Sequence, residues 1–203
     1  MTQELFEPLG MTGCGFGPTT VTPDMPPTQP WGHLGDSWAA HVMPVPPSPW
    51  ANVASSMVPD GGLHCNLVSW QRYLAAHLKE DPDFLAPSAW KYIHTGITPS
   101  YGGGSYGFGW FMDHDDTAGR ILQHGGTDGH NFAQAFLLPD IPGGLGLVVA
   151  TNNGGTMGRG NRQAKGFNSM LEWIFTHPAG LAAGVGEGLG ALARDSWVEE
   201  KLA

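Results

Sequence analysis

Hydrophobic and polar residues change their spacing along this chain, from a helical period to a strand-like alternation and back. The first long stripe of helical spacing follows Asn66, whose side chain can accept a hydrogen bond from the backbone N–H of Ser69. The apolar positions of this stripe are Leu67, Trp70, Tyr73, Leu74, His77 and Leu78. We expect this helix to end at residues 81–83, because Pro82 restricts the residue before it. A second, short helix is expected over residues 87–94, with a proline in its first turn.

Downstream of these helices the pattern alternates with a period of two, which is typical of strands. Expected strands cover residues 106–112, 120–123, 131–138 and 145–151, and expected turns cover residues 115–119 and 139–144. Strands joined in sequence by short turns predict an antiparallel meander. An amphipathic helix is then expected over residues 161–177. Helices, then strands, then a helix indicate the α+β class, with an antiparallel sheet flanked by helices.

The N-terminal part and the C-terminal end of the chain are less regular. Residues 2–9 have the spacing of a helix end, which Gly10 stops. Residues 12–62 hold most of the prolines, so we expect extended, irregular backbone there. We interpret residues 1–177 as one portion of a domain. Residues 178–203, rich in Gly and Ala and then charged, are interpreted as a loose tail.

The charge of the chain excludes several classes of partner. The chain has 9 Lys and Arg against 18 Asp and Glu, which gives a formal net charge of −9. Without a basic stripe, binding to nucleic acid or to an anionic membrane surface has no electrostatic basis. No apolar run reaches the length of a membrane span. We take Cys14 and Cys65 as two small buried hydrophobic side chains, although they could also pair.

The segment richest in candidate chemistry is residues 123–130, Gln-His-Gly-Gly-Thr-Asp-Gly-His. It lies between two expected strands, and its glycines allow a ligand to approach the backbone closely. A histidine at the end of a strand, such as His124, can donate to a carboxylate or to a developing oxyanion. The segment is equally compatible with a glycine-rich hairpin that carries surface histidines.

Five segments, in order along the chain, resemble the serine β-lactamase, penicillin-binding protein and related esterase superfamily. They are residues 5–11 (Leu-Phe-Glu-Pro-Leu-Gly-Met), 59–74 (Pro-Asp-Gly-Gly-Leu and the helix after it), 106–110 (Tyr-Gly-Phe-Gly-Trp), 124–126 (His-Gly-Gly) and 145–152. Residues 124–126 are similar to the family's third motif, written Lys-Thr-Gly or His-x-Gly. Residues 31–33 (Trp-Gly-His) also resemble a segment of some esterase-like members. The resemblance implies the C-terminal portion of the β-lactamase/transpeptidase-like fold.

The resemblance also assigns roles to the residues of the third motif. By resemblance, His124 contacts substrate and tunes the charge of the site, and Gly125 and Gly126 let the substrate lie against the strand. Thr127 offers its backbone N–H to the oxyanion hole. In the family, a Ser-x-x-Lys motif holds the nucleophile and its base, and a Tyr-x-Asn motif holds a second proton-transfer group. Both lie upstream of the segment that residues 5–11 resemble, so neither motif is in its expected place in this chain.

Two other short motifs look like nucleophile sites but stand in the wrong context. Ser88 and Lys91 spell Ser-x-x-Lys on one helix face, but the family has an unrelated short helix at this point. Residues 103–107 spell Gly-x-Ser-x-Gly, but a nucleophile elbow needs a strand before it and a helix after it. Residues 102–107 also contain Gly-x-Gly-x-x-Gly, without the strand-turn-helix unit that dinucleotide binding needs. We therefore expect a chance match at Ser88 and a glycine loop ahead of a strand at 102–107.

We expect no metal site and no cofactor. His114, His124 and His130 are near one another in the sequence, but no His-x-x-x-His pair falls on an expected helix and no Cys-x-x-Cys occurs. We interpret these histidines as solvated turn residues.

These observations predict a partial serine hydrolase whose intact parent cleaves an ester, an amide or a β-lactam through an acyl-serine. Esterase activity is at least as well supported as β-lactamase activity, because lactamases often carry Lys-Thr-Gly where this chain has His-Gly-Gly. Nucleophilic catalysis collapses without its nucleophile and base, so the chain alone is expected to be inactive. The alternative is a non-catalytic binding or interaction module, or a split-gene fragment that complements an N-terminal partner.

The last expected strand suggests how this chain could associate. In the intact family, N-terminal elements complete the sheet, so residues 145–151 would form an exposed apolar edge here. An open apolar edge favours pairing with another chain. We therefore expect association of the chain with itself or with an N-terminal fragment.

Overall fold

A computed structural model describes residues 1–17, 29–34, 43–48, 55–100 and 103–154 of the chain. The chain divides into two compact units, Met1–Ala164 and Lys165–Ala203, and every element below belongs to the first. The helix expected over residues 161–177 and the tail over residues 178–203 lie outside the described residues.

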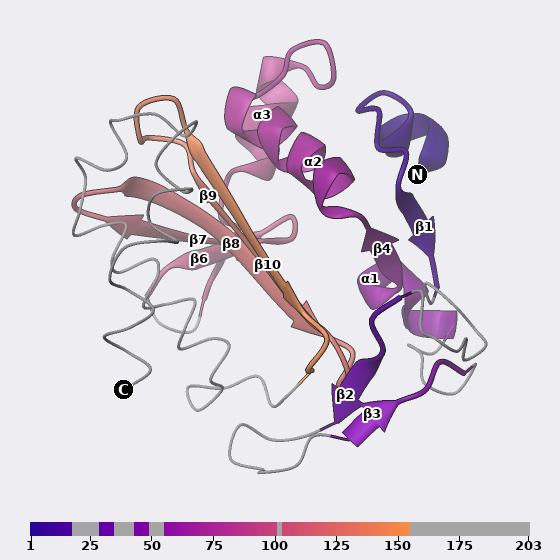
Figure 1. The fold of residues 1–203 in the computed structure, drawn as a ribbon. Helices are drawn as coiled ribbons and strands as arrows, with labels where there is room; N and C mark the ends of the chain where they lie inside the picture. The colour runs from indigo at the N-terminus through magenta and orange to yellow at the C-terminus, as the bar shows by residue number, and fades with distance from the viewer. Residues whose placement is uncertain (18–28, 35–42, 49–54, 101–102, 155–203) are drawn as a thin grey trace, which may run out of the picture. The chain divides into compact units, whose positions relative to one another are not determined.

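Six strands form the main sheet, in the order β10-β9-β8-β7-β6-β5, and every pair is antiparallel (Figure 1). The strands are β5 (Thr98–Pro99), β6 (Ser105–Gly107), β7 (Trp110–Asp115), β8 (Gly119–Thr127), β9 (Phe132–Leu138) and β10 (Leu145–Thr151). Each strand pairs with its neighbour in sequence, as short turns require. The predicted antiparallel meander is therefore confirmed. Strand β10 lies at the end of the sheet, and within the described part of the chain its one strand partner is β9.

The single strand expected over residues 106–112 is wrong, because the chain turns within it. Phe108 and Gly109 both have positive φ, of 51° and 87°. Two such residues in a row make the tight turn of a two-residue hairpin. The alternating pattern on the two sides of this turn therefore belongs to β6 and β7, in which Tyr106 lies opposite Phe111.

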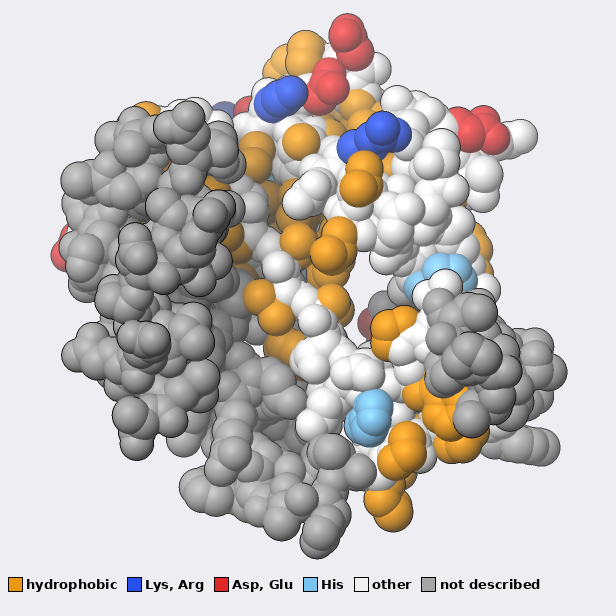
Figure 2. Space-filling view, viewed as in Figure 1, with side chains coloured by type: hydrophobic (Ala, Val, Ile, Leu, Met, Phe, Trp, Pro, Cys, Tyr) orange, Lys and Arg blue, Asp and Glu red, His pale blue; other side chains and the backbone are white. Residues whose placement is uncertain are grey.

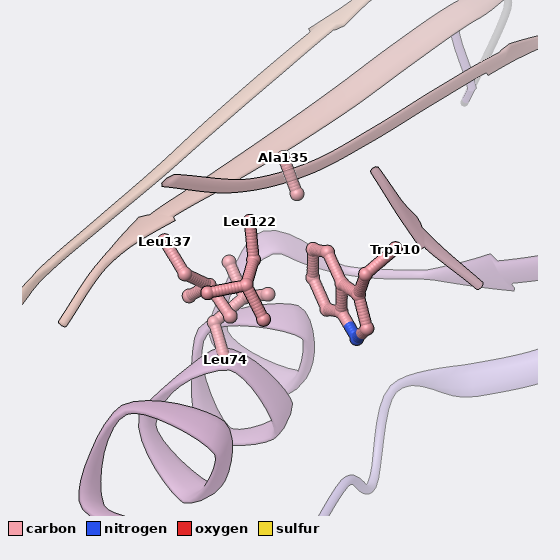
Figure 3. Packing of buried hydrophobic residues seen from close by; sticks show 5 residues of the cluster. All are labelled: Leu74, Trp110, Leu122, Ala135 and Leu137. Carbon is pink, nitrogen blue, oxygen red and sulfur yellow. The ribbon is translucent and has the colours of Figure 1, made fainter. Parts of the chain in front are cut away.

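Helix α2 (Leu67–Lys79) packs against strands β9 and β10 of the sheet. It begins as predicted, since the Asn66 side chain accepts from the backbone N–H of Ser69 at 2.8 Å. It ends slightly before the expected residues, at Glu80, which adopts a left-handed φ of 46°. Its central side chain, Leu74, points at the sheet and meets four side chains from the strands (Figure 3). They are Trp110, Leu122, Ala135 and Leu137.

Helix α3 (Pro87–Ile93) confirms the second predicted helix to within one residue. Its Trp90 side chain is fully buried, and the indole N–H donates to the carbonyl of Asp81 at 2.9 Å. This hydrogen bond satisfies the one polar atom of a ring that otherwise packs in apolar surroundings. It also ties α3 to the segment that follows α2.

The N-terminal part contains short elements, and those that lie within residues 12–62 stand where irregular backbone was expected. They are η1 (Thr2–Phe6), β1 (Cys14–Phe16), β2 (Gly32–Leu34), β3 (Met43–Val45), η2 (Ser55–Met57), α1 (Val58–Gly61) and β4 (Leu63–Cys65). Strand β1 pairs with β4, and β2 pairs with β3. The helical turn expected near the start is present as η1, and Gly10 stops it with a φ of +62°. No helix within the described ranges combines the length and the apolar character that crossing a bilayer requires.

Cys14 and Cys65 form a disulfide, so the interpretation as two separate buried thiols is wrong. The two residues are direct partners in the β1–β4 pair. Opposite residues of an antiparallel pair bring their Cβ atoms close together, which is why this register favours the bond. The periodicity of the sequence gave no sign of strands this short.

Candidate functional site

The second half of β8 presents an open backbone edge. The strand expected over residues 120–123 continues to Thr127, so the candidate motif lies inside β8 rather than after it. Residues His124 to Thr127 all pair with β9 on one side. On the other side, pairing with β7 ends at Phe111 opposite Gln123. Alternate residues of this half-strand therefore direct backbone N–H and C=O groups toward an edge that carries no strand among the described residues.

His124 stands at the start of this open edge, against two aromatic rings. Its side chain is exposed. Its ring stacks on Phe111 with a centroid distance of 5.8 Å and an interplanar angle of 22°, and the Tyr106 ring lies 6.2 Å away. The aromatic contacts hold the imidazole at the junction of β7 and β8 while leaving its nitrogens available.

Gly125 and Gly126 differ in what surrounds them. A Cβ added at Gly125 would lie 3.3 Å from Cγ of Gln134. A Cβ added at Gly126 would meet no described atom within 4 Å, and Gly126 does not have a left-handed φ. Neither backbone geometry nor the described packing therefore requires glycine at 126. The absence of a side chain there leaves open space beside the edge of the strand.

Thr127 ends β8 and organises the turn that follows. Its hydroxyl lies 2.6 Å from the carbonyl of Asn131 and 3.0 Å from the carbonyl of Gly154, and it accepts the Gly129 N–H at 3.0 Å. The Asp128 carboxylate accepts the backbone N–H groups of His130 and Asn131 at 2.8 and 2.6 Å. The Thr127 side chain is thus engaged in the turn, and the group it can offer a ligand is on the backbone.

The β2–β3 hairpin lies at the same end of β8, which sequence reasoning missed. The backbone N–H of His33 donates to the carbonyl of His130 at 2.9 Å. His33 also forms a parallel bridge with Asn153, just after β10. In the sequence, residues 31–33 (Trp-Gly-His) stand out only by their resemblance to a segment of esterase-like proteins. Gly32 is the sequence signal there for a close backbone contact.

The two serine motifs do not form reactive centres in the structure. Ser88 and Lys91 are both exposed on α3, and nothing positions the amine against the hydroxyl. Ser105 lies inside β6, opposite Met112, which is not the strand-to-helix turn of a nucleophile elbow. The glycine loop ahead of a strand is therefore confirmed at residues 103–104, directly before β6, and residue 102 lies outside the described residues.

His114, His124 and His130 lie at different places along β7, β8 and the β8–β9 turn. In the portion of the chain that the structure describes, no group of three or more His, Cys, Asp or Glu side chains is arranged to hold a metal ion. The interpretation of all three as solvated turn residues is wrong in detail. His114 and His124 belong to strands, and Nδ1 of His130 is buried.

A pair of histidines joins α2 to the C-terminal end of α3. Nδ1 of His77 is 2.9 Å from Nε2 of His94, and Nδ1 of His94 is 3.4 Å from the Glu80 carboxylate. A carboxylate can only accept, so His94 carries its proton on Nδ1 and accepts the His77 N–H at Nε2. Burial, together with His94 beside it, lowers the pKa of His77 to about 3. Burial likewise lowers the pKa of His94, although Glu80 opposes that shift.

This cluster is part of the core. The rings of Tyr73, Trp90 and Trp110 lie 4.5, 5.0 and 5.2 Å from the ring of His77. His77 was counted in the apolar stripe of the helix, and its burial agrees with that position. Its partner His94 is distant in sequence, so no local pattern pointed to the pair.

The family model described as Beta-lactamase matches residues 1–166 of this chain. The match includes every described element, from η1 to β10. The comparison with curated proteins gave no match.

This fold is similar to that of several solved structures. The penicillin binding protein from Bacillus halodurans has a TM-score of 0.58 and 16% identity, over 85% of this chain and 48% of that chain. The octameric penicillin-binding protein homologue from Pyrococcus abyssi has a TM-score of 0.57 and 19% identity, over 74% and 32%. The D-stereospecific amidohydrolase from Streptomyces sp. has a TM-score of 0.54 and 21% identity, over 75% and 43%. The chain thus spans less than half the length of each of these three proteins.

Proposed function

Because this chain belongs to the Beta-lactamase family, we propose that it forms one wall of the acyl-binding groove of a serine hydrolase. The observation that carries this proposal is the open backbone edge of His124–Thr127, with empty space beside Gly126. An extended acyl group can pair with such an edge as an added strand would. Gly126 admits that group because no side chain intervenes.

In this proposal the reaction is acyl transfer to a serine that lies outside residues 1–203. A general base takes the serine proton, and the serine oxygen attacks the ester or amide carbonyl. The backbone N–H of Thr127 donates to the oxyanion that forms, and His124 contacts the substrate and stabilises negative charge. The alcohol or amine leaves with a proton, and water then cleaves the acyl-serine.

The chain spans 32% to 48% of the length of the solved proteins above, so the nucleophile and its base are assigned to an N-terminal portion. The chain by itself is expected to turn over neither nitrocefin nor a p-nitrophenyl ester. Ser88→Ala is the control for the exposed Ser-x-x-Lys motif. Turnover that this substitution abolishes would place the nucleophile in α3 and reject the proposal.

The DNA upstream of Met1 provides the sharper test. An in-frame Ser-x-x-Lys followed by Tyr-x-Asn would identify a longer enzyme that can be produced whole. In that longer protein, His124→Ala and Gly126→Val are expected to lower kcat/KM by about 100-fold or more, as losses of transition-state contacts do. Unchanged kcat/KM in both variants would remove β8 from the active site.

The second candidate is a binding module that keeps the groove without the chemistry. The positions of Ser88 and Lys91 favour it. Both side chains are exposed on α3, so this Ser-x-x-Lys motif does not form an activated nucleophile. A fluorophosphonate probe distinguishes the two candidates in the longer protein. Covalent labelling of a serine supports the hydrolase, whereas saturable binding of an ester or amide without labelling supports the module.

Association is proposed through β10. Its outer edge has no strand partner in the described part of the chain, and hydrophobic side chains lie in the region of α2 and β10 (Figure 2). The isolated chain is expected to self-associate, or to bind an N-terminal fragment that completes the sheet. Light scattering coupled to size-exclusion chromatography tests this. A monomer that melts cooperatively at every concentration would contradict it.

A further inference from the structure

Helix α3 depends on few contacts outside itself. It is seven residues long, and a helix this short is not stable on its own in water. It has no side-chain cap at its N-terminus, and Trp90 is its one buried residue. The Trp90 ring lies 5.0 Å from the ring of His77 in α2 and 5.6 Å from the ring of His94, which ends α3. The position of α3 is therefore set where Trp90, His77 and His94 meet.

The two histidines hold α3 to α2 while both are neutral. His94 accepts the Nδ1–H of His77 at Nε2, across 2.9 Å, and directs its own Nδ1–H toward the Glu80 carboxylate. A second proton on His94 would occupy Nε2, so two N–H donors would face each other. A second proton on His77 would place a charge between the rings of Trp90 and Trp110. Either proton therefore opposes the contact that holds α3.

The surroundings of the pair do not offset such a charge. The titratable and charged side chains of the described residues that act on the pair are Tyr73, Glu80 and Arg120. Burial raises the pKa of Tyr73, which keeps this ring neutral beside His77. Glu80 favours a charged His94, but its side chain is 47% exposed and is screened by solvent. Arg120, which is paired with Asp140, opposes that charge.

Helix α3 also supports the hairpin formed by β6 and β7. The Tyr92 ring of α3 lies 4.5 Å from the ring of Phe108, at the turn of this hairpin. Just after α3, the backbone N–H of Ile97 donates to the carbonyl of Tyr106 in β6 at 2.9 Å. The Tyr106 ring lies 6.2 Å from the ring of His124. A movement of α3 therefore removes contacts from the hairpin that lies against His124.

We propose that the His77–His94 pair is an acid-sensitive latch, whose protonation releases α3 and with it the β6–β7 hairpin beside His124, while β8 to β10 stay folded. The pKa of His77 is about 3 in the closed latch and returns to 6.5 in water, so the latch is fully stable above pH 6.5 and weakens as the pH falls toward 3. Between pH 7.5 and pH 5, this one histidine favours the released state by about 30-fold. The consequence for the groove rests on the proposed function, whereas the latch itself does not.

Hydrogen exchange of backbone amides tests the latch in the whole ¹⁵N-labelled chain. Opening constants are measured by nuclear magnetic resonance at pH 7.5 and pH 5, each referred to the intrinsic exchange rate at that pH. The reporters are the amides of His94, which donates to the Trp90 carbonyl, and of Ile97. Leu137, in the middle of β9, is the internal control.

The expected result is a local opening that acid increases. From pH 7.5 to pH 5, the opening constants at His94 and Ile97 are expected to rise by about 30-fold or more, and to stay well above that of Leu137. Equal constants at all three amides would mean that α3 is released only by global unfolding, which would overturn the latch. A rise at His94 without one at Ile97 would overturn the link to the hairpin.

Three variants identify the groups that take up the protons. His77→Phe keeps an aromatic ring and is expected to reduce the rise to the part that His94 contributes. His114→Gln removes an exposed histidine of β7 and should leave the rise unchanged. Glu80→Gln acts at a half-exposed position, so it tests the latch even if His77→Phe fails to fold. It removes the charge that favours a protonated His94 in the closed latch, so the rise is expected to become steeper.

The outcomes keep the latch separate from the chemistry. A rise that survives His77→Phe in full, or one that Glu80→Gln leaves unchanged or smaller, would overturn the latch. An acid-induced opening in a protein that hydrolyses neither esters nor amides would retain the latch and reject the proposed hydrolase. Hydrolysis by the longer protein without any rise at His94 and Ile97 would do the reverse.

Discussion

The two halves of β8 show how one strand serves both the core and the candidate groove. From Gly119 to Gln123 the strand pairs with β7, Leu122 and Gln123 also pair with β9, and Leu122 is buried beneath α2. From His124 to Thr127 it keeps one partner, and its side chains are exposed or half-buried. The paired half fixes the position of the strand, so the open half can hold a precise edge without packing of its own. Mutations in the two halves are therefore expected to differ in their effect on stability.

The largest effect is expected at the core that anchors the paired half. Leu74 is 2% exposed and contacts Leu122 and Leu137. Leu74→Ala is expected to lower the free energy of unfolding by about 2–5 kcal/mol, through lost burial and the cavity left behind. Urea unfolding measures it. Val68→Ala, on the same helix at 61% exposed, is the matched control and should stay within about 0.5 kcal/mol. Equal losses in the two variants would show that α2 does not anchor the sheet.

The Cys14–Cys65 disulfide is expected to have the next largest effect. It joins residues 51 apart and stands directly before Asn66, the N-cap of α2. The pair Cys14→Ala and Cys65→Ala is expected to lower the free energy of unfolding by about 2–4 kcal/mol. Thermal unfolding with and without a reductant measures the same effect in the unaltered chain. If neither the two substitutions nor the reductant changes the midpoint of unfolding, β1 and β4 contribute little to the support of α2.

Acid is expected to weaken the same core through the buried histidine pair. The pKa of His77 is about 3 in the folded chain, against 6.5 without the fold. A lowered folded pKa means that the unfolded chain binds more protons, so stability is full above pH 6.5 and falls as the pH drops toward 3. The expected slope is up to about 1.4 kcal/mol per pH unit for one proton. Urea unfolding between pH 7 and pH 4.5 measures it, while most carboxylates stay ionised.

Substitution of single histidines shows which residue causes this dependence of stability on pH. His77→Phe keeps an aromatic ring among Tyr73, Trp90 and Trp110. It is expected to reduce the slope in that pH range to the part that His94 contributes, since burial also lowers the pKa of His94. His114→Gln removes an exposed histidine of β7 and should leave the slope unchanged. If the slope survived His77→Phe, the protons would be taken up elsewhere.

The sequence predicted those parts of the fold that local patterns control. The N-cap at Asn66, helix α3, the strands β9 and β10 and the meander all followed from spacing and turn residues. The turn at Phe108 was missed because a bulky residue rarely adopts positive φ, so it looked like strand. The disulfide was missed because β1 and β4 are too short to show a period.

The candidate site was predictable only in part, for a related reason. Residues 124–127 are contiguous, so a motif could point to them. At the Thr127 end of β8, His33 and Trp31 contact Asn152, which lies 119 and 121 positions away in the sequence. No local rule brings such residues together, because their contact depends on where the sheet ends. The open edge of β8 likewise follows from the point at which β7 stops pairing, which is a property of the sheet.

The smallest effect on stability is expected at Gly126, which lies in the open half of β8. Gly126→Ala adds a Cβ with no described atom within 4 Å, at a backbone conformation that alanine adopts readily. The free energy of unfolding should change by about 0.5 kcal/mol or less. Gly32→Ala is the matched contrast, since its Cβ would lie 2.6 Å from His130 and must displace the hairpin. Urea unfolding of both variants makes the comparison. A large loss at Gly126 would mean that the protein itself fills the space assigned to substrate. A stable Gly126→Ala chain would mean that the space is available to a ligand.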